Sequence, residues 1–268
     1  MTTDSPIIVA PHPSIPGVAT FTMNRPKALN ALNESMTKAF VPAIQAVAND
    51  LSIRVLIVQG EGEHFMAGGD IKGFSETLAT PGEARKKHFL EMIHFLHSGI
   101  ELMQRMPVVT VAKIRGACAG FGMSLGIGCD LSIASEDAYF ATAYKAIGLT
   151  PDGGQSFFLP RLVGVKKAME LTLLSERVSA QEAAHLGFVN RVFANDQIDA
   201  AVDKIAAQIA RSARGSMAGA KRLLNSSMQS TLSAQLDAEA ESFSSCAAKQ
   251  DFAEGISAFI EKRPAKFD

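Results

Sequence analysis

Short runs of β-branched and other apolar residues alternate with longer helical patterns along the first part of this chain. The expected strands are Val18–Met23, Val55–Gln59 and Val108–Ile114, with Leu131–Ala134 and Tyr139–Ala141 as weaker candidates. Asn33–Asp50 and Pro81–Arg105 carry apolar residues at the spacing of amphipathic helices. Strands that alternate with helices are typical of parallel sheets built from βαβ units. The sequence therefore predicts an α/β fold.

Two residues set the expectations for the first of these helices. Asn33 stands immediately before Glu34 and is a good N-cap, so the helix should begin there. Pro42 lies inside the same pattern. Because proline has no backbone N–H and its ring crowds the preceding turn, we expect the helix to kink or restart at this position.

The strand signals end near Ile198, and only helical patterns follow. These patterns cover Ile198–Arg211, Ser216–Ser227, Ala234–Ala248 and Phe252–Lys262. We expect an α/β core over residues 1–200 and a helical C-terminal segment over residues 201–268. The boundary is approximate, because no obvious linker separates the two parts. Helices that lack a core of their own bury their apolar faces on a neighbour. The second part is therefore expected to make oligomer contacts.

The composition bears on the class of partner. The 268 residues are 47% hydrophobic and 20% charged with a net charge of −1, which favours neither nucleic acid nor a membrane surface. Cys118, Cys129 and Cys246 lack metal-ligand spacing and are expected to be buried, reduced thiols. No signal-peptide pattern and no run of roughly 18 apolar residues is found. We expect a cytoplasmic protein without a metal site.

Two glycine-rich segments follow strand candidates. Residues 63–72 (EHFMAGGDIK) lead into a helix start at Asp70, and residues 116–130 (GACAGFGMSLGIGCD) form an unusually glycine-dense helix start. A helical glycine costs about 1 kcal/mol, so this density needs a reason. A capped turn at Asp70 and close helix packing would be sufficient. The alternative is a pair of backbone N–H groups that stabilise an oxyanion, such as the oxygen of a thioester enolate.

Two further segments carry candidate polar groups. Asp152 lies in a PDGG turn between apolar flanks, where burial would raise the pKa of its carboxyl and make it a proton acceptor near neutral pH. A structural turn residue is the simpler interpretation. Arg25 and Lys27 lie in residues 23–32 (MNRPKALNAL) and form a basic turn. This turn is either solvated or contacts the phosphate groups of a large anionic ligand.

These four segments, together with the ending EGISAFIEKRPAKF, resemble the enoyl-CoA hydratase/isomerase (crotonase) family from about Val18 almost to the end of the chain. The resemblance implies a crotonase-like core of repeated ββα units with a helical C-terminal trimerisation segment. It also implies a homotrimer, often paired as a hexamer, and an acyl-CoA thioester as substrate. Coenzyme A is then part of the substrate, and no separate cofactor is expected.

The resemblance transfers family positions to this chain residue by residue. The backbone N–H groups of the oxyanion hole fall at Gly69 and Phe121. Lys27 corresponds to a position from which the side chain approaches the phosphate groups of coenzyme A. The positions that line the pocket for the rest of coenzyme A correspond to Ala28, Leu29, Ala67, Asp70 and Ile71.

The chain departs from the family pattern at the general acid and base. Hydratases of the family use two glutamates, and Ser124 and Tyr144 stand at those positions. Hydration by paired carboxylates is therefore not expected, and Tyr144 is kept as a substrate-binding candidate. Asp152 matches the single proton shuttle of some family isomerases, and its surroundings resemble the ring-opening isomerases of phenylacetate degradation. The same position is the nucleophile in the 4-chlorobenzoyl-CoA dehalogenase branch. That branch uses a helix histidine as its base, and His94 and His97 lie near, but not at, the aligned position.

The leading hypothesis is an enoyl-CoA isomerase that moves a double bond between the 3 and 2 positions with Asp152 as its base. Hydration by an altered site, aryl-CoA dehalogenation and non-catalytic acyl-CoA binding are the alternatives. A Rossmann dehydrogenase is disfavoured, because Leu125 replaces the third glycine of the dinucleotide fingerprint after Gly120 and Gly122.

Overall fold

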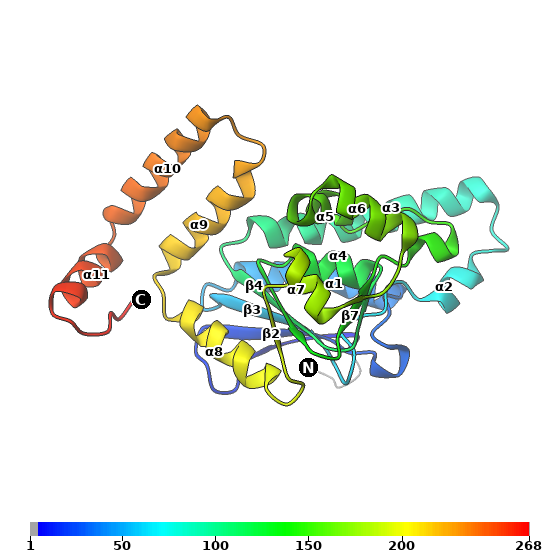
Figure 1. Cartoon of the computed structure of the whole chain (residues 1–268), viewed down its shortest axis with the longest axis horizontal. Coiled ribbons are helices and arrows are strands. Elements are labelled where there is room, and N and C mark those ends of the chain that lie inside the picture. The colour runs from blue at the N-terminus through cyan, green and yellow to red at the C-terminus, as the bar shows by residue number, and fades with distance from the viewer. Residues whose placement is uncertain (1–4, 268) are drawn as a thin grey trace.

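The computed structural model describes residues 5–267 and shows an α/β core from which three C-terminal helices extend (Figure 1). The larger sheet has the strand order β1-β2-β3-β4-β6-β9. Its strands are β1 (Ile7–Pro11), β2 (Val18–Met23), β3 (Val55–Gly60), β4 (Val109–Ile114), β6 (Leu131–Ser135) and β9 (Arg191–Phe193). β1 pairs antiparallel with β2, and each following pair is parallel. The prediction of a parallel α/β sheet is confirmed.

A smaller sheet contains β5 (Ala117–Ala119), β7 (Tyr139–Ala141) and β8 (Val178–Ser179). Two strands precede a helix at three places along the chain: β1 and β2 before α1 (Glu34–Asn49), β4 and β5 before α4 (Phe121–Gly128), and β6 and β7 before α5 (Gln155–Val163). The expected repeated ββα units are therefore confirmed. In this arrangement, α4 starts directly after β5, and η2 (Tyr144–Ile147) follows β7.

Helices cover both faces of the larger sheet, because alternate strand residues point to opposite sides. On one face, Phe40 of α1 and Leu96 of α3 (Gly82–Arg105) share the main core with Leu125 of α4. On the other face, α8 (Ile198–Ala210) packs Val202 and neighbouring apolar residues against Ile57 and its strand neighbours. Figure 1 shows α8 below the strands and α3, α5 and α6 above them.

Beyond α8 the chain leaves the core as three helices, which we call the arm (residues 214–260). The arm consists of α9 (Arg214–Ser227), α10 (Leu232–Ala247) and α11 (Gln250–Ile260), drawn in yellow-orange to red at one end of the molecule (Figure 1). The C-terminal helical patterns are thus confirmed as helices, and the first of them is the helix that covers the sheet. Among residues 5–267, no helix combines the length and apolar character that a membrane crossing requires.

Several features differ from the expectations. α1 runs through Pro42 as one helix, so the expected restart does not occur. Val41 and Ile44 on either side of it are buried, and burial of such side chains offsets the lost hydrogen bond. Cys246 is only half-buried, whereas Cys118 and Cys129 are buried as expected. The elements that the sequence did not predict include β1, β5, β8, β9, α5, α6 (Val165–Leu174) and α7 (Ala180–Leu186).

Candidate active site

The first glycine-rich loop connects β3 to α2 (Ile71–Glu76) and is held by backbone hydrogen bonds to Leu32. The N–H of Leu32 donates to the Gly68 oxygen at 2.7 Å, and the N–H of Asp70 donates to the Leu32 oxygen at 2.9 Å. Gly69 lies between these two bonds, and its own N–H has no acceptor among the residues that the structure describes. The loop therefore holds one unpaired donor in a fixed position.

The side chain of Asp70 stabilises the helix that follows this loop. Its Oδ1 accepts from the N–H groups of Lys72 at 3.1 Å and Gly73 at 3.4 Å, which makes Asp70 the N-cap of α2. Its Oδ2 pairs with Arg25 at 2.8 Å, and this ion pair with the N-cap bonds lowers the pKa of the Asp70 carboxyl although burial opposes the shift. The interpretation of Asp70 as an acidic cap is confirmed.

The second glycine-rich segment places another unpaired donor beside the first. Phe121 is the first residue of α4, so its N–H has no partner within the helix, and it has none elsewhere in the described part of the chain. A Cβ built on Gly120 would lie 3.3 Å from the Cα of Gly68, so the two loops are in contact. The N–H groups of Gly69 and Phe121 therefore belong to touching segments, as a two-donor oxyanion hole requires.

The turn that carries Asp152 packs tightly against α4. Gly153 and Gly154 have φ values of 61° and 86°, which favour glycine. A Cβ on Gly153 would lie 2.7 Å from the ring of Phe121 and 3.0 Å from the Cβ of Ser124. Any larger residue at position 153 would push the turn away from α4. The glycines thus bring Asp152 close to the start of α4.

Asp152 lies in a small hydroxyl network at this contact. The Tyr144 hydroxyl donates to Asp152 Oδ1 at 2.5 Å. The Ser124 hydroxyl donates to the backbone oxygen of Asp152 at 2.8 Å and lies 3.2 Å from the Tyr144 hydroxyl. The structure therefore brings together Asp152 and the two residues, Ser124 and Tyr144, that the resemblance aligned with a glutamate pair. Sequence comparison gave these positions, but it gave no indication of the hydrogen bonds between them.

The surroundings of this network shift both ionisable groups toward their neutral forms. Burial raises the pKa of the Asp152 carboxyl, although the Tyr144 hydrogen bond and the nearby His97 oppose the shift. Burial raises the pKa of the Tyr144 hydroxyl well above its usual value, and the charge of Asp152 is the next largest cause of this shift. Tyr144 is therefore a neutral hydrogen-bond donor, and Asp152 has the character of a proton acceptor.

Two more polar side chains lie beside the turn. His97 of α3 accepts a hydrogen bond at Nε2 from the N–H of Gly153 at 3.0 Å, whereas His94 on the same helix is exposed. Gln155 is 1% exposed, and neither polar atom of its side chain has a partner among the described residues. Buried amides of this kind are normally satisfied by solvent or a ligand. The sequence carried no signal for Gln155, because a glutamine after a turn is ordinarily exposed.

The residues expected to contact coenzyme A lie on two neighbouring segments near Gly69. The N–H of Ala67 donates to the Leu29 oxygen at 3.0 Å, so these segments are directly paired. Leu29 and Ile71 are 42% and 56% exposed, which leaves apolar surface available. Lys27 is exposed in η1 (Pro26–Ala28), and Ala28 beside it is half-buried. This surface borders the unpaired N–H of Gly69.

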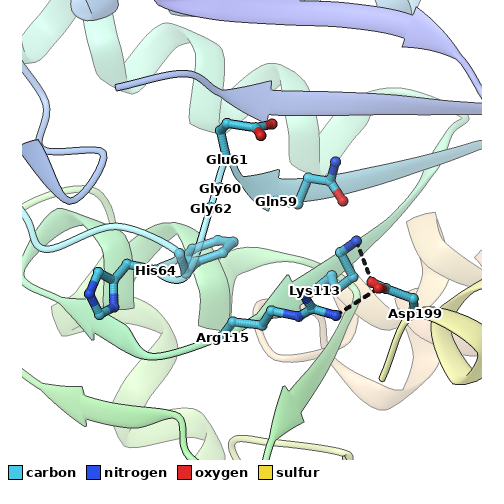
Figure 2. A pocket seen from close by; sticks show the side chains of 9 residues that line it. Gln59, Gly60, Glu61, Gly62, His64, Lys113, Arg115 and Asp199 are labelled. Atoms are coloured by element: carbon cyan, nitrogen blue, oxygen red, sulfur yellow. Dashed lines mark hydrogen bonds and ion pairs between the residues drawn. The ribbon is translucent and has the colours of Figure 1, made fainter. Parts of the chain in front are cut away.

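A separate polar hollow lies at the carboxyl ends of β3 and β4 (Figure 2). Lys113 Nζ and Arg115 Nη2 pair with the two carboxylate oxygens of Asp199 in α8, at 2.8 Å and 2.7 Å. By the alternation of strand residues, Gln59 and Lys113 lie on the face that α8 covers, opposite the core that contains Phe121. The hollow is thus distinct from the Asp152 site, and its ion pairs hold α8 on the sheet. No three His, Cys, Asp or Glu side chains in residues 5–267 are grouped to hold a metal ion.

The chain is similar to known proteins along nearly its whole length. The sequence model of the family described as Enoyl-CoA hydratase/isomerase matches residues 15–268. The chain is 35% identical to a crotonyl-CoA hydratase of Syntrophomonas wolfei (93% of this chain, 94% of the relative). It is 30% identical to a 1,2-epoxyphenylacetyl-CoA isomerase of Escherichia coli (94% and 95%) and to a 4-chlorobenzoyl coenzyme A dehalogenase of an Arthrobacter species (92% and 88%). The crystal structure of an enoyl-CoA hydratase from a Polaromonas species matches with a TM-score of 0.90 at 31% identity, over 98% of this chain and 99% of that one.

Proposed function

This chain belongs to the enoyl-CoA hydratase/isomerase family, and from that premise we propose that it is an enoyl-CoA isomerase that moves a double bond between the 3 and 2 positions. Its relatives carry hydratase, isomerase and dehalogenase names, so the choice rests on this chain's own residues. The observation that carries the proposal is the site around Asp152. Among the described residues, its hydrogen-bonding partners are hydroxyl groups and a backbone N–H, and none is a second carboxylate.

The proposed reaction uses one base and two backbone donors. Asp152 takes the proton from the α carbon, and the electron pair of that bond forms a dienolate. The N–H groups of Gly69 and Phe121 stabilise the negative charge on the thioester oxygen. Asp152 then returns the proton to the γ carbon, which leaves the double bond at the 2 position. The reaction consumes no water, so the glutamate pair of a hydratase is not required.

The same proposal assigns the substrate and the assembly. The coenzyme A moiety binds along the surface near Gly69 that is formed by Lys27, Ala28, Leu29, Ala67, Asp70 and Ile71, and Tyr144 lies at the acyl side. Coenzyme A is part of the substrate, and the reaction needs no separate cofactor. We further propose that the chain assembles as a homotrimer or a pair of trimers through the arm, whose apolar side chains are exposed in the single chain.

Replacement of the base tests the reaction. Asp152→Asn keeps the size of the side chain but removes its ability to accept the α-proton, so turnover of a 3-enoyl-CoA should fall by about 10²–10⁴-fold. The conjugated 2-enoyl thioester is followed by its ultraviolet absorbance, and binding of acetyl-CoA is checked by calorimetry. Asp196→Asn is the matched control, because it makes the same change at an exposed carboxylate and should leave turnover unchanged.

Product identity separates the other activities. A product heavier than the substrate by one water would assign a hydratase, and chloride release from 4-chlorobenzoyl-CoA would assign a dehalogenase. Binding of acyl-CoA without turnover of any enoyl-CoA would assign a binding protein. Each of these results, or full isomerase turnover in Asp152→Asn, contradicts the proposal.

A further inference from the structure

The hydroxyl protons beside Asp152 can be assigned by counting donors and acceptors. The Ser124 hydroxyl lies 2.8 Å from the backbone oxygen of Asp152 and 3.3 Å from that of Gly120. Both of these oxygens can only accept, so the single proton of Ser124 goes to one of them. The Tyr144 proton is then directed to Asp152 Oδ1, which lies 2.5 Å from its hydroxyl oxygen.

The two carboxylate oxygens of Asp152 are consequently in different situations. Oδ1 accepts from the Tyr144 hydroxyl, whereas no side chain among the described residues donates to Oδ2. The backbone N–H of Asp152 itself also favours the charged carboxylate. The adjacent backbone N–H of Gly153 donates to His97 Nε2 at 3.0 Å and is not available to the carboxylate. One oxygen is occupied and the other is free to take a proton.

We propose that Tyr144 is a positioning residue that reserves Oδ2 of Asp152 for both proton transfers, an inference that rests on the isomerase function proposed above. In the first transfer, the α C–H bond breaks, its electron pair enters the dienolate, and the proton forms a bond with Oδ2. Tyr144 continues to donate to Oδ1, which is now a carbonyl oxygen. In the second transfer, the Oδ2–H bond breaks and the proton bonds to the γ carbon, which restores the carboxylate.

Tyr144 does not itself act as the base in this scheme. Burial and the charge of Asp152 raise the pKa of its phenol, so it keeps its proton. The titratable groups that act on Asp152 are Tyr144 from η2 and His97 from α3, and Ser124 from α4 carries no charge.

Carboxyl-carbon NMR titration of Asp152 tests the hydrogen bond without requiring turnover. The Asp152 signal is assigned by its loss in Asp152→Asn. A hydrogen bond to a carboxylate favours the charged form, so Tyr144→Phe should move the titration midpoint upward by roughly one to two pH units. Tyr139→Phe is the matched control, since it removes the chain's other phenol hydroxyl and keeps the ring against which Arg177 stacks. Its midpoint should equal that of the unaltered protein.

A labelled substrate tests the reserved oxygen. A 3-enoyl-CoA with deuterium on the α carbon should give a product that retains part of its deuterium at the γ carbon. Tyr144→Phe frees Oδ1 to share the proton, so retention should fall at least about twofold, while Tyr139→Phe should match the unaltered protein.

The outcomes separate this inference from the proposed function. Full turnover in Asp152→Asn would refute the isomerase mechanism, whatever the titration shows. An unchanged midpoint in Tyr144→Phe overturns the role of Tyr144, even when Asp152→Asn is inactive. Two results would overturn the proposal that Oδ2 alone carries the proton. One is an active Tyr144→Phe variant with unchanged label retention, and the other is an unaltered protein that retains no label. If Tyr144→Phe is inactive, the titration midpoint of Asp152 alone decides whether Tyr144 has the positioning role.

Discussion

Asp152 is the residue at which the needs of folding and of proton transfer conflict. Burial raises the pKa of its carboxyl, so the folded protein binds this proton more tightly than the unfolded chain does. The group therefore favours folding most at low pH. Its contribution falls as the pH rises from the usual aspartate range through the raised pKa, and it stays reduced at neutral pH.

Asp152→Asn should consequently increase the free energy of unfolding at neutral pH while it removes activity, because the amide has no charge to desolvate. The difference from the unaltered protein should disappear below the usual aspartate pKa of about 3.9. Urea unfolding at several pH values measures it, with Asp196→Asn as the exposed control. An Asp152→Asn protein that is less stable at neutral pH would show that the carboxylate is well compensated by its partners.

At this scale, the sequence predicted the candidate base but not its environment. The PDGG turn between apolar flanks indicated a buried Asp152, and in the structure Asp152 is half-buried, with a carboxyl pKa that its desolvation raises. The bonds from Ser124 and Tyr144 depend on side-chain rotamers and on the contact between α4 and the turn, which no local pattern encodes. The N-cap role of Asp70 is local and was therefore predictable.

Among the elements, α9 is joined to the core at a mostly buried ion pair between Lys221 and Asp130. Lys221 Nζ donates to the backbone oxygens of Met103 at 2.7 Å and Val108 at 2.8 Å. It also pairs with Asp130 Oδ2 at 2.8 Å, and that oxygen accepts from the N–H of Thr110 at 2.7 Å. The lysine thus joins α9 to the end of α3 and to β4, where the arm leaves the core.

Lys221→Met should lower the free energy of unfolding by about 3–5 kcal/mol, because it leaves the mostly buried Asp130 carboxylate without its counter-charge and two carbonyl oxygens without their donor. Urea unfolding measures the loss. Lys38→Met is the matched control: Lys38 pairs with Glu34 in an exposed helix pair, and its loss should cost at most about 1 kcal/mol. Equal losses in the two variants would mean that the buried network does not anchor α9.

The elements with long periodic patterns were predictable, and the short ones were not. α3 and β4 have apolar spacing that is set by the face they bury, so the sequence alone indicates them. β8 has two residues and β9 has three, and both form through pairing with distant strands. α5 begins after Gly154 and contains Pro160, which by local rules resembles a loop.

In the whole molecule, the arm extends from the α/β core (Figure 1), and none of its residues belongs to the two hydrophobic clusters of the described chain. Its helices expose large apolar side chains, among them Leu224 at 72%, Leu232 at 75%, Phe243 at 74% and Phe259 at 85%. Exposed apolar surface of this extent favours association, because burying it is worth about 25 cal/mol per Å². A second copy of the chain offers the same surface, so a closed symmetric assembly can bury every arm.

The protein should therefore elute as a trimer or a hexamer when size-exclusion chromatography is combined with light scattering at micromolar concentration. Phe243→Glu places a charge on the exposed apolar surface of α10 and should shift the distribution toward monomers, since an interface charge without a partner is costly to desolvate. Leu51→Glu is the matched control, because Leu51 is equally exposed at 74% but lies outside the arm, and the assembly should survive this change. A monomeric unaltered protein, or an assembly that Phe243→Glu leaves intact, would mean that the arm does not join the subunits in this way.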